Sequence, residues 1–350
     1  MTIMKIKQLY ILLAWAALTS TVASCTKEEK FPVGDYEPIT ISTLAPDTFG
    51  TKAMLSESTF KTSGNRIQIY DFVDNETNPH INDQIGPEVT GSSSAQGQAG
   101  VWPFVGGSHQ WKPGSHKFFG WLVKDANMSS SNTPDSFFGS GFGFSRTFTN
   151  GTPSDVLTIP SKQMTPTTPQ FDFMFSNVYT TEPTNTPVPL EFSHLFCAVS
   201  FGFINTSNAS VSVSKFQVNI YQEASAKIFF WNSVEYTRGN SGVETFRTNN
   251  NSKTIASNGE VPNAFNYSAT EQEYLLQWPI TRTELSYCNM TITYRQSGKT
   301  YNNVSLSFPN IELLPGKKYH FNISFIDKQP IRVNYEVVDW HDIENIVTFE

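Results

Sequence analysis

Short segments in which polar and apolar residues alternate recur along most of the chain. Alternation with a period of two puts successive side chains on opposite faces of a strand, and it predicts strands with one buried face. Runs rich in Gly, Pro, Asn and Ser separate these segments, and no segment carries a long helical period. The clearest candidates are residues 39–44, 66–72, 117–123, 156–160, 171–176, 188–204, 211–221, 287–294, 304–308, 320–325 and 331–337. The pattern therefore predicts an all-β protein.

A proline-containing segment divides these strands into two blocks. Residues 180–189 hold Pro183, Pro187 and Pro189 among Thr, Glu and Asn, which is typical of a linker. Many short strands on each side favour two β-sandwiches in tandem. We expect an N-terminal sandwich over residues 38–180 and a C-terminal one over residues 181–350.

The last strand runs to the end of the printed chain. Ile346, Val347, Thr348 and Phe349 alternate, and no polar tail follows them. An apolar strand at a chain end needs a pairing partner, because unpaired backbone groups and exposed apolar faces are costly.

Composition narrows the class of protein. Of the 350 residues, 14% are aromatic and 16% are charged, which suits an extracellular β protein better than a helical enzyme. The formal net charge of -7 argues against a nucleic-acid partner. Three cysteines are too few for a disulfide framework.

The first 24 residues are typical of a signal peptide. Lys5 and Lys7 precede the apolar run 9–18, which is too short to span a bilayer. Residues 22–25 (Val-Ala-Ser-Cys) resemble the lipobox of bacterial lipoproteins. The resemblance implies cleavage between Ser24 and Cys25 and acylation of Cys25, for example with palmitate. An ordinary secretory signal with an incidental cysteine is the alternative.

A tether follows over residues 25–37. Lys27, Glu28 and Glu29 resemble the surface-export signal of Bacteroidetes lipoproteins. The alternative is a solvated, charged tether without an export role.

Four segments, in order along the chain, resemble the fimbrillin family, the lipoprotein pilins of Bacteroidales fimbriae. Each segment alone is weakly specific, whereas the ordered set is fairly specific. They are residues 101–103 (Val-Trp-Pro) with 117–121, residues 171–176, residues 189–201, and residues 314–319 with Asp339-Trp340.

The resemblance implies two transthyretin-like β-sandwich domains and assembly by strand exchange. A protease removes the first strand of a lipidated precursor, and the C-terminal strand of another subunit fills the vacated groove. Here the removable strand would hold Ile39, Ile41 and Leu44. Residues 346–349 would be the donor strand. The implied protein is a shaft, tip or anchor subunit of a pilus at the outer membrane. It would contact other fimbrial subunits and, in adhesion, a host or bacterial surface ligand.

The maturation site departs from the family pattern. The family commonly has an Arg after the first strand, but the first Arg here is Arg66, which we expect to begin a strand. Lys52, followed by Ala53, is the candidate in the preceding loop. Either a protease cuts after Lys52, or the strand stays in place, as would suit an anchor subunit.

Nothing in the sequence predicts catalysis, a metal or a cofactor. His341, Asp342 and Glu344 lie at an expected turn, and we interpret His194 as a hydrogen-bonded core residue. For Cys197 and Cys288, buried free thiols are favoured over a disulfide between them. The alternative function is glycan capture by a surface lipoprotein, through Trp102, Trp111 or the Phe-rich residues 137–143.

Overall fold

The computed structural model describes residues 36–44, 66–86, 102–124, 133–166, 171–230, 233–265, 273–327, 329–339 and 347–349. Regular structure in these residues is almost entirely β-strand. The two helices described, α3 (Pro134–Phe138) and α4 (Arg282–Leu285), are about one turn long. The predicted all-β class is therefore confirmed.

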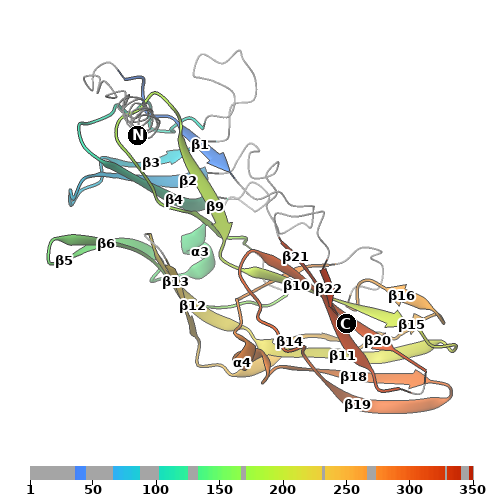
Figure 1. Ribbon diagram of the computed structural model, residues 1–350. Helices are drawn as coiled ribbons and strands as arrows, with labels where there is room; N and C mark the ends of the chain where they lie inside the picture. The colour runs from blue at the N-terminus through green and yellow to red at the C-terminus, as the bar shows by residue number, and fades with distance from the viewer. Residues whose placement is uncertain are drawn as a thin grey trace, which may run out of the picture.

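Two sheets make up the first sandwich, at the upper left of Figure 1. The larger sheet has the order β1-β9-β7-β4-β2-β3, with β8 paired to β4, and the smaller has the order β13-β12-β6-β5. The larger sheet comprises β1 Ile41–Leu44, β2 Arg66–Val73, β3 Ile81–Ile85, β4 His116–Lys124, β7 Met174–Ser176, β8 Tyr179–Thr181 and β9 Val188–His194. The smaller comprises β5 Gly143–Thr149, β6 Thr152–Gln163, β12 Glu223–Phe229 and β13 Ser233–Arg238.

The second sandwich, at the lower right of Figure 1, also has two sheets. Their orders are β16-β10-β20-β21-β22, with β17 paired to β10, and β14-β11-β18-β19, with β15 paired to β11. The first comprises β10 Cys197–Asn205, β16 Gly259–Val261, β17 Leu275–Gln277, β20 Lys317–Phe325, β21 Arg332–Asp339 and β22 Val347–Phe349. The second comprises β11 Val211–Tyr221, β14 Val243–Asn249, β15 Lys253–Ile255, β18 Asn289–Gln296 and β19 Lys299–Ser307.

The seven-stranded sheet curls until its two outer strands share a neighbour. Ile41 of β1 bridges Trp102, and Ile85 of β3 bridges Phe104, so residues 102–104 join the first strand of the sheet to the last. Side chains of one face point into the enclosed space, where Ile67, Ile69 and Trp102 are fully buried. Because the strand period is two, their neighbours in sequence face outward.

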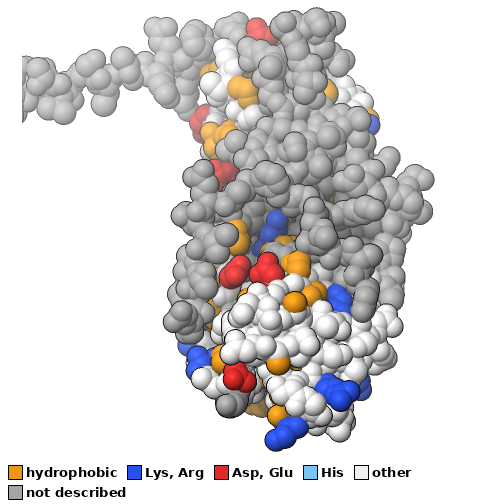
Figure 2. Space-filling model, turned by 90° about the vertical axis from the view of Figure 1, so that its right-hand side faces the viewer, with side chains coloured by type: hydrophobic (Ala, Val, Ile, Leu, Met, Phe, Trp, Pro, Cys, Tyr) orange, Lys and Arg blue, Asp and Glu red, His pale blue; other side chains and the backbone are white. Residues whose placement is uncertain are grey.

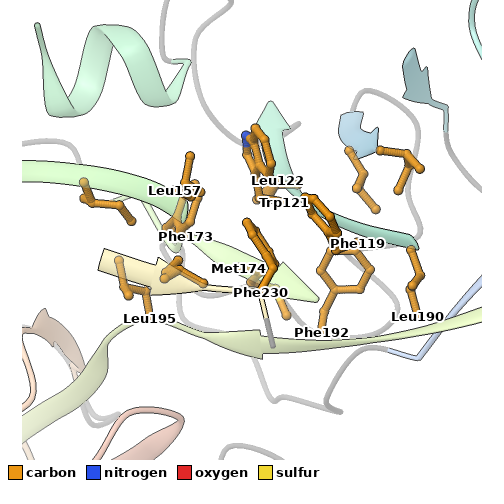
Figure 3. Close-up of a cluster of buried hydrophobic side chains, with 14 of the residues drawn as sticks. Phe119, Trp121, Leu122, Leu157, Phe173, Met174, Leu190, Phe192, Leu195 and Phe230 are labelled. Atoms are coloured by element: carbon orange, nitrogen blue, oxygen red, sulfur yellow. The ribbon is translucent and has the colours of Figure 1, made fainter. Parts of the chain in front are cut away.

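The outward face packs against the four-stranded sheet. Figure 3 shows Phe119 and Trp121 of β4 beside Phe230, which follows β12. The ring centroids of Phe119 and Phe230 are 4.2 Å apart. Each such ring, once buried, contributes about 1.5–3 kcal/mol to the free energy of unfolding.

The chain crosses between the two sandwiches at two places, and at each place one strand leads almost directly into the next. Only Leu195 and Phe196, both fully buried, separate β9 from β10, and only Gln222 separates β11 from β12. Strands β9 and β12 pair with strands from the first half of the chain, and β13 pairs with β12. The sheets therefore do not divide at residues 180 and 181, where the prolines predicted the boundary. Pro189 lies inside β9 rather than in a linker.

A buried ion-pair cluster also joins the two sheets of the first sandwich. The fully buried Asp155 of β6 accepts hydrogen bonds from Lys117 Nζ of β4 (2.7 Å) and from Arg146 Nη1 of β5 (3.0 and 3.1 Å). The Arg146 guanidinium lies 3.8 Å from the ring centre of Phe72. Lys117 thus connects the larger sheet to a carboxylate of the smaller one.

Replacing Asp155 by Ala should lower the free energy of unfolding by about 3–5 kcal/mol, because the buried Arg146 guanidinium would lose the carboxylate that it pairs with and Lys117 would lose its bond across the two sheets. Urea unfolding of the purified protein measures the change. Glu235→Ala is the matched control. Glu235 is exposed and lies opposite the exposed Lys227 in the β12–β13 pair, so we expect a change within about 0.5 kcal/mol. Equal stability of the two variants would contradict the role given to Asp155.

Candidate functional site

The first strand occupies a slot between β9 and residues 102–109. On one side β1 runs parallel to β9, with Ile41 opposite Val188, and Val188 N donates to Thr40 O (2.8 Å). On the other side Trp102 N donates to Ile41 O, and Ile39 N donates to His109 O, both at 2.8 Å. The backbone of residues 39–41 is therefore hydrogen-bonded on both sides, and the rest of β1 pairs with β9.

Two side chains fill the interior of this slot. Ile39 is 2% exposed and Ile41 is fully buried, and both belong to the core cluster of the first sandwich. For Leu44 the structure gives the backbone pairing, opposite Glu191. Residues 41–44 thus form a strand, and this strand closes the curled sheet.

The C-terminal strand lies in the other sandwich. The backbone of β22 pairs antiparallel with β21 through three residue pairs, with Val347 opposite Val337 and Phe349 opposite Tyr335. β22 ends the strand order of its sheet, next to the label C in Figure 1. It is therefore attached along one edge by a short ladder.

Several predicted positions fall outside the described residues. They are the signal-cleavage and lipidation residues Ser24 and Cys25, the export signal Lys27, Glu28 and Glu29, the maturation site Lys52 and Ala53, and Ile346 of the donor strand.

Comparison with known proteins identifies the family. The sequence model of the fimbrillin-like family matches residues 51–340. The chain belongs to the fimbrillin-like family. A search of curated proteins finds no match.

Solved structures from Bacteroidales resemble this fimbrillin-like chain in fold. A fimbrial protein of Bacteroides vulgatus has a TM-score of 0.50 and 13% identity, over 86% of this chain and 99% of that one. A candidate cell adhesion protein of Bacteroides ovatus has a TM-score of 0.49 and 17% identity, over 89% and 99%. A fimbrial assembly protein of Parabacteroides distasonis has a TM-score of 0.42 and 13% identity, over 90% and 100%.

Four of the aromatic residues considered for glycan contact are core residues, whereas Phe142 is only partly buried. Trp102 is fully buried, and Trp111, Phe137 and Phe138 are also buried. The two phenylalanines belong to helix α3, which Thr133 caps by accepting a hydrogen bond from Ser136 N. These four rings stabilise the first sandwich of the fimbrillin-like chain and present no open face to a sugar.

Two buried His–Asp pairs also belong to the core. His116 Nδ1 lies 2.6 Å from Asp71 Oδ2, and His194 Nδ1 lies 2.8 Å from Asp172 Oδ1. Burial raises the pKa of Asp71, more than His116 lowers it. For His116, burial acts to lower the pKa, but the hydrogen bond and the charge of Asp71 outweigh burial and raise it. The interpretation of His194 as a hydrogen-bonded core residue is confirmed.

Other candidate chemistry in the described residues is limited. Cys197 and Cys288 are free and buried, and burial raises the pKa of both thiols, for Cys288 to about 11.

The described residues contain no group of three or more side chains that could together hold a metal ion. No helix within the described ranges is both long and apolar enough to cross a membrane.

On the face shown in Figure 2, the described surface carries both charged and hydrophobic side chains. Lys and Arg side chains lie mainly toward its lower end, Asp and Glu lie in small separate groups, and hydrophobic side chains are scattered among them. The described part of this face carries no broad basic or apolar patch.

Replacing Ile41 by Ala should lower the free energy of unfolding by about 2–5 kcal/mol, because the slot would lose buried apolar volume that its neighbours cannot refill. Chemical denaturation of the purified chain measures this. Val105→Ala is the control, because Val105 belongs to the segment beside β1 but is 60% exposed. If both variants unfolded at the same denaturant concentration, β1 would not occupy the slot in solution.

Proposed function

We propose that this fimbrillin-like chain is a structural, non-catalytic subunit of a cell-surface fimbria, and that β-strand exchange joins one copy to the next. The observation that carries the proposal is the slot of β1. The short strand β1 and the residues just before it supply Ile41 and Ile39 to the core, and β1 closes the curled sheet. If β1 left, β9 would have an open edge beside an apolar slot, which a strand from another chain can fill.

The donor is the C-terminal strand of a second copy, residues 346–349. Only three residue pairs hold β22 to β21, and β22 lies at the edge of its sheet. Releasing it breaks few hydrogen bonds and leaves β21 paired to β20. Because donor and slot lie in different sandwiches, such a contact is head-to-tail and grows a filament.

Chain order supports Lys52 as the maturation site. Lys52 lies between the end of β1 at Leu44 and the start of β2 at Arg66. A cut after Lys52 would separate β1 from the rest of the chain and leave every later strand whole. Arg66 is itself the first residue of β2 and lies opposite Lys124, so a cut there would damage a core strand.

The precursor is an outer-membrane lipoprotein in this proposal. Acylated Cys25 anchors it, and Lys27, Glu28 and Glu29 direct its export to the cell surface. Its partners are other fimbrial subunits. A chain that kept β1 and its lipid would serve as the anchor of the fibre.

Deleting residues 345–350 should abolish the detergent-resistant ladders expected of polymerised subunits, because the donor strand would be gone. Val347→Asp should do the same, since a charge cannot enter an apolar slot, whereas Thr348→Ser should leave the ladders intact. Gel electrophoresis of unheated surface fractions provides the readout. Ladders that survive the deletion would contradict strand exchange through this segment.

N-terminal sequencing of the subunit from assembled fibres should give Ala53 as the first residue. Lys52→Ala should block this processing and reduce polymerisation. Lys61→Ala, a change at another lysine in the same interval of the chain, should have no effect. A start at acylated Cys25 in the fibre would contradict the cut and would fit an anchor subunit instead.

A further inference from the structure

A groove of about 400 Å³ lies on the outward face of the seven-stranded sheet. Strands β2, β3 and β4 form its floor through Arg66, Gln68, Gln84 and Trp121, and Phe144 at the start of β5 stands in its wall. Its volume falls at the lower end of the range for small-molecule sites in proteins.

The groove exists because the two sheets of the first sandwich differ in width. The smaller sheet ends at β5, whereas the larger one continues through β2 to β3. Part of the outward face of the larger sheet is therefore left without a facing strand. The end of the smaller sheet becomes one wall, and the start of helix α3, with Asp135 exposed, becomes another.

Polar side chains occupy the floor at positions fixed by strand pairing. Gln68 lies opposite Gln84 of β3 on one side and opposite Trp121 of β4 on the other. The Gln68 amide nitrogen donates to Asn82 Oδ1 (2.8 Å) and to Asp83 O (3.1 Å), which orients the side chain. Because these bonds use the nitrogen, the amide oxygen can accept a bond from a ligand.

A rigid aromatic cluster forms the apolar part of the groove. The ring of Tyr70 stacks on Trp121, with centroids 5.2 Å apart, and packs at 4.6 Å against Phe144. Tyr70 and Phe144 are only partly buried, so part of each ring remains accessible. Such rings offer a large apolar surface at a small cost in conformational entropy.

We propose that this groove binds a sugar ring of a carbohydrate. The C–H face of a pyranose can pack on the aromatic rings, while its hydroxyl groups can exchange hydrogen bonds with Gln68, Gln84 and Arg66. One cationic and one acidic side chain, Arg66 and Asp135, line the groove, so its charges balance and a neutral, hydroxyl-rich ligand fits better than an ion.

A peptide strand fits this groove less well. Strand addition needs an open sheet edge, but the β3 edge is already paired, since Val105 N donates to Gln84 O (2.7 Å) and Gly86 N donates to Pro103 O (2.8 Å). The floor of the groove consists of side chains on a sheet face. It also lies on the opposite face of the sheet from the interior that Ile41 fills, so sugar binding does not depend on strand exchange.

Titration calorimetry of the purified, unpolymerised protein tests the proposal. The probes are maltohexaose, cellohexaose, mannohexaose and N-acetyllactosamine, with the peptide of residues 345–350 as a competing class of ligand. At least one saccharide should bind. Gln68→Ala and Phe144→Ala should each weaken its binding about tenfold, the effect of losing one good hydrogen bond or one ring contact.

Gln217→Ala is the matched control, because Gln217 is a half-buried strand glutamine in the other sandwich. It should bind the saccharide as the parent protein does. Thermal unfolding of each variant separates loss of binding from loss of fold, and Gln68→Ala, which leaves the aromatic cluster whole, serves if Phe144→Ala unfolds. Failure of all four saccharides to bind, or binding that survives both substitutions, would overturn the proposal. Peptide binding that Gln68→Ala removes would assign the groove to a peptide instead.

Discussion

Closure of the seven-stranded sheet is the constraint on which the first sandwich depends. Residues 102–104 bridge both β1 and β3, so the curled sheet encloses an apolar interior with no open seam among its described strands. Closure depends on β1, because β1 links β9 to the segment of residues 102–104. It is short, it is the first described strand of the chain, and together with the residues just before it, it contributes two buried isoleucines. An interior that relies on one terminal strand remains complete when a strand from another molecule takes that place.

The same constraint extends to the second sandwich through continuous strands. β9 pairs with β1 and passes through Leu195 and Phe196 into β10, which lies between β16 and β20 in the next sheet. β10 runs parallel to β20, which pairs with β21 and through it with β22. In a polymer of the proposed kind, tension between slot and donor strand would follow covalent chain and long ladders rather than a flexible linker. The fully buried Phe196 and Trp278, with rings 4.8 Å apart, pack beside this junction.

The sequence predicted several strands with a clear apolar alternation, including the edge strands β1 and β22, and it missed the interior strand β12 and the edge strands β3 and β13. β2, β11 and β20 alternate clearly, and Arg66 begins β2 as expected. β3 carries Asn, Asp and Gln between its two isoleucines and shows no periodic apolar signal. β13 alternates, but only Val234 and Tyr236 on its inner face are apolar, and both are only partly buried. The crossing of β9, β12 and β13 into the first sandwich could not be predicted either, because pairing between distant strands leaves no local pattern.

The alternation of residues 39–44 predicted the strand β1 because those residues are consecutive, and the idea of an exchangeable slot came from the family resemblance, whereas the groove could not be inferred from sequence. Gln84, Gln68 and Trp121 become neighbours only through the register of three strands, and a shift of one residue would turn Gln68 inward. Register also separates the two surfaces. Ile67 and Ile69 face the interior that β1 closes, while Gln68 and Tyr70 face outward. The period-two geometry of one strand, β2, therefore separates the apolar interior, where we propose strand exchange, from the polar, aromatic face, where we propose sugar binding, and a change on one face need not disturb the other.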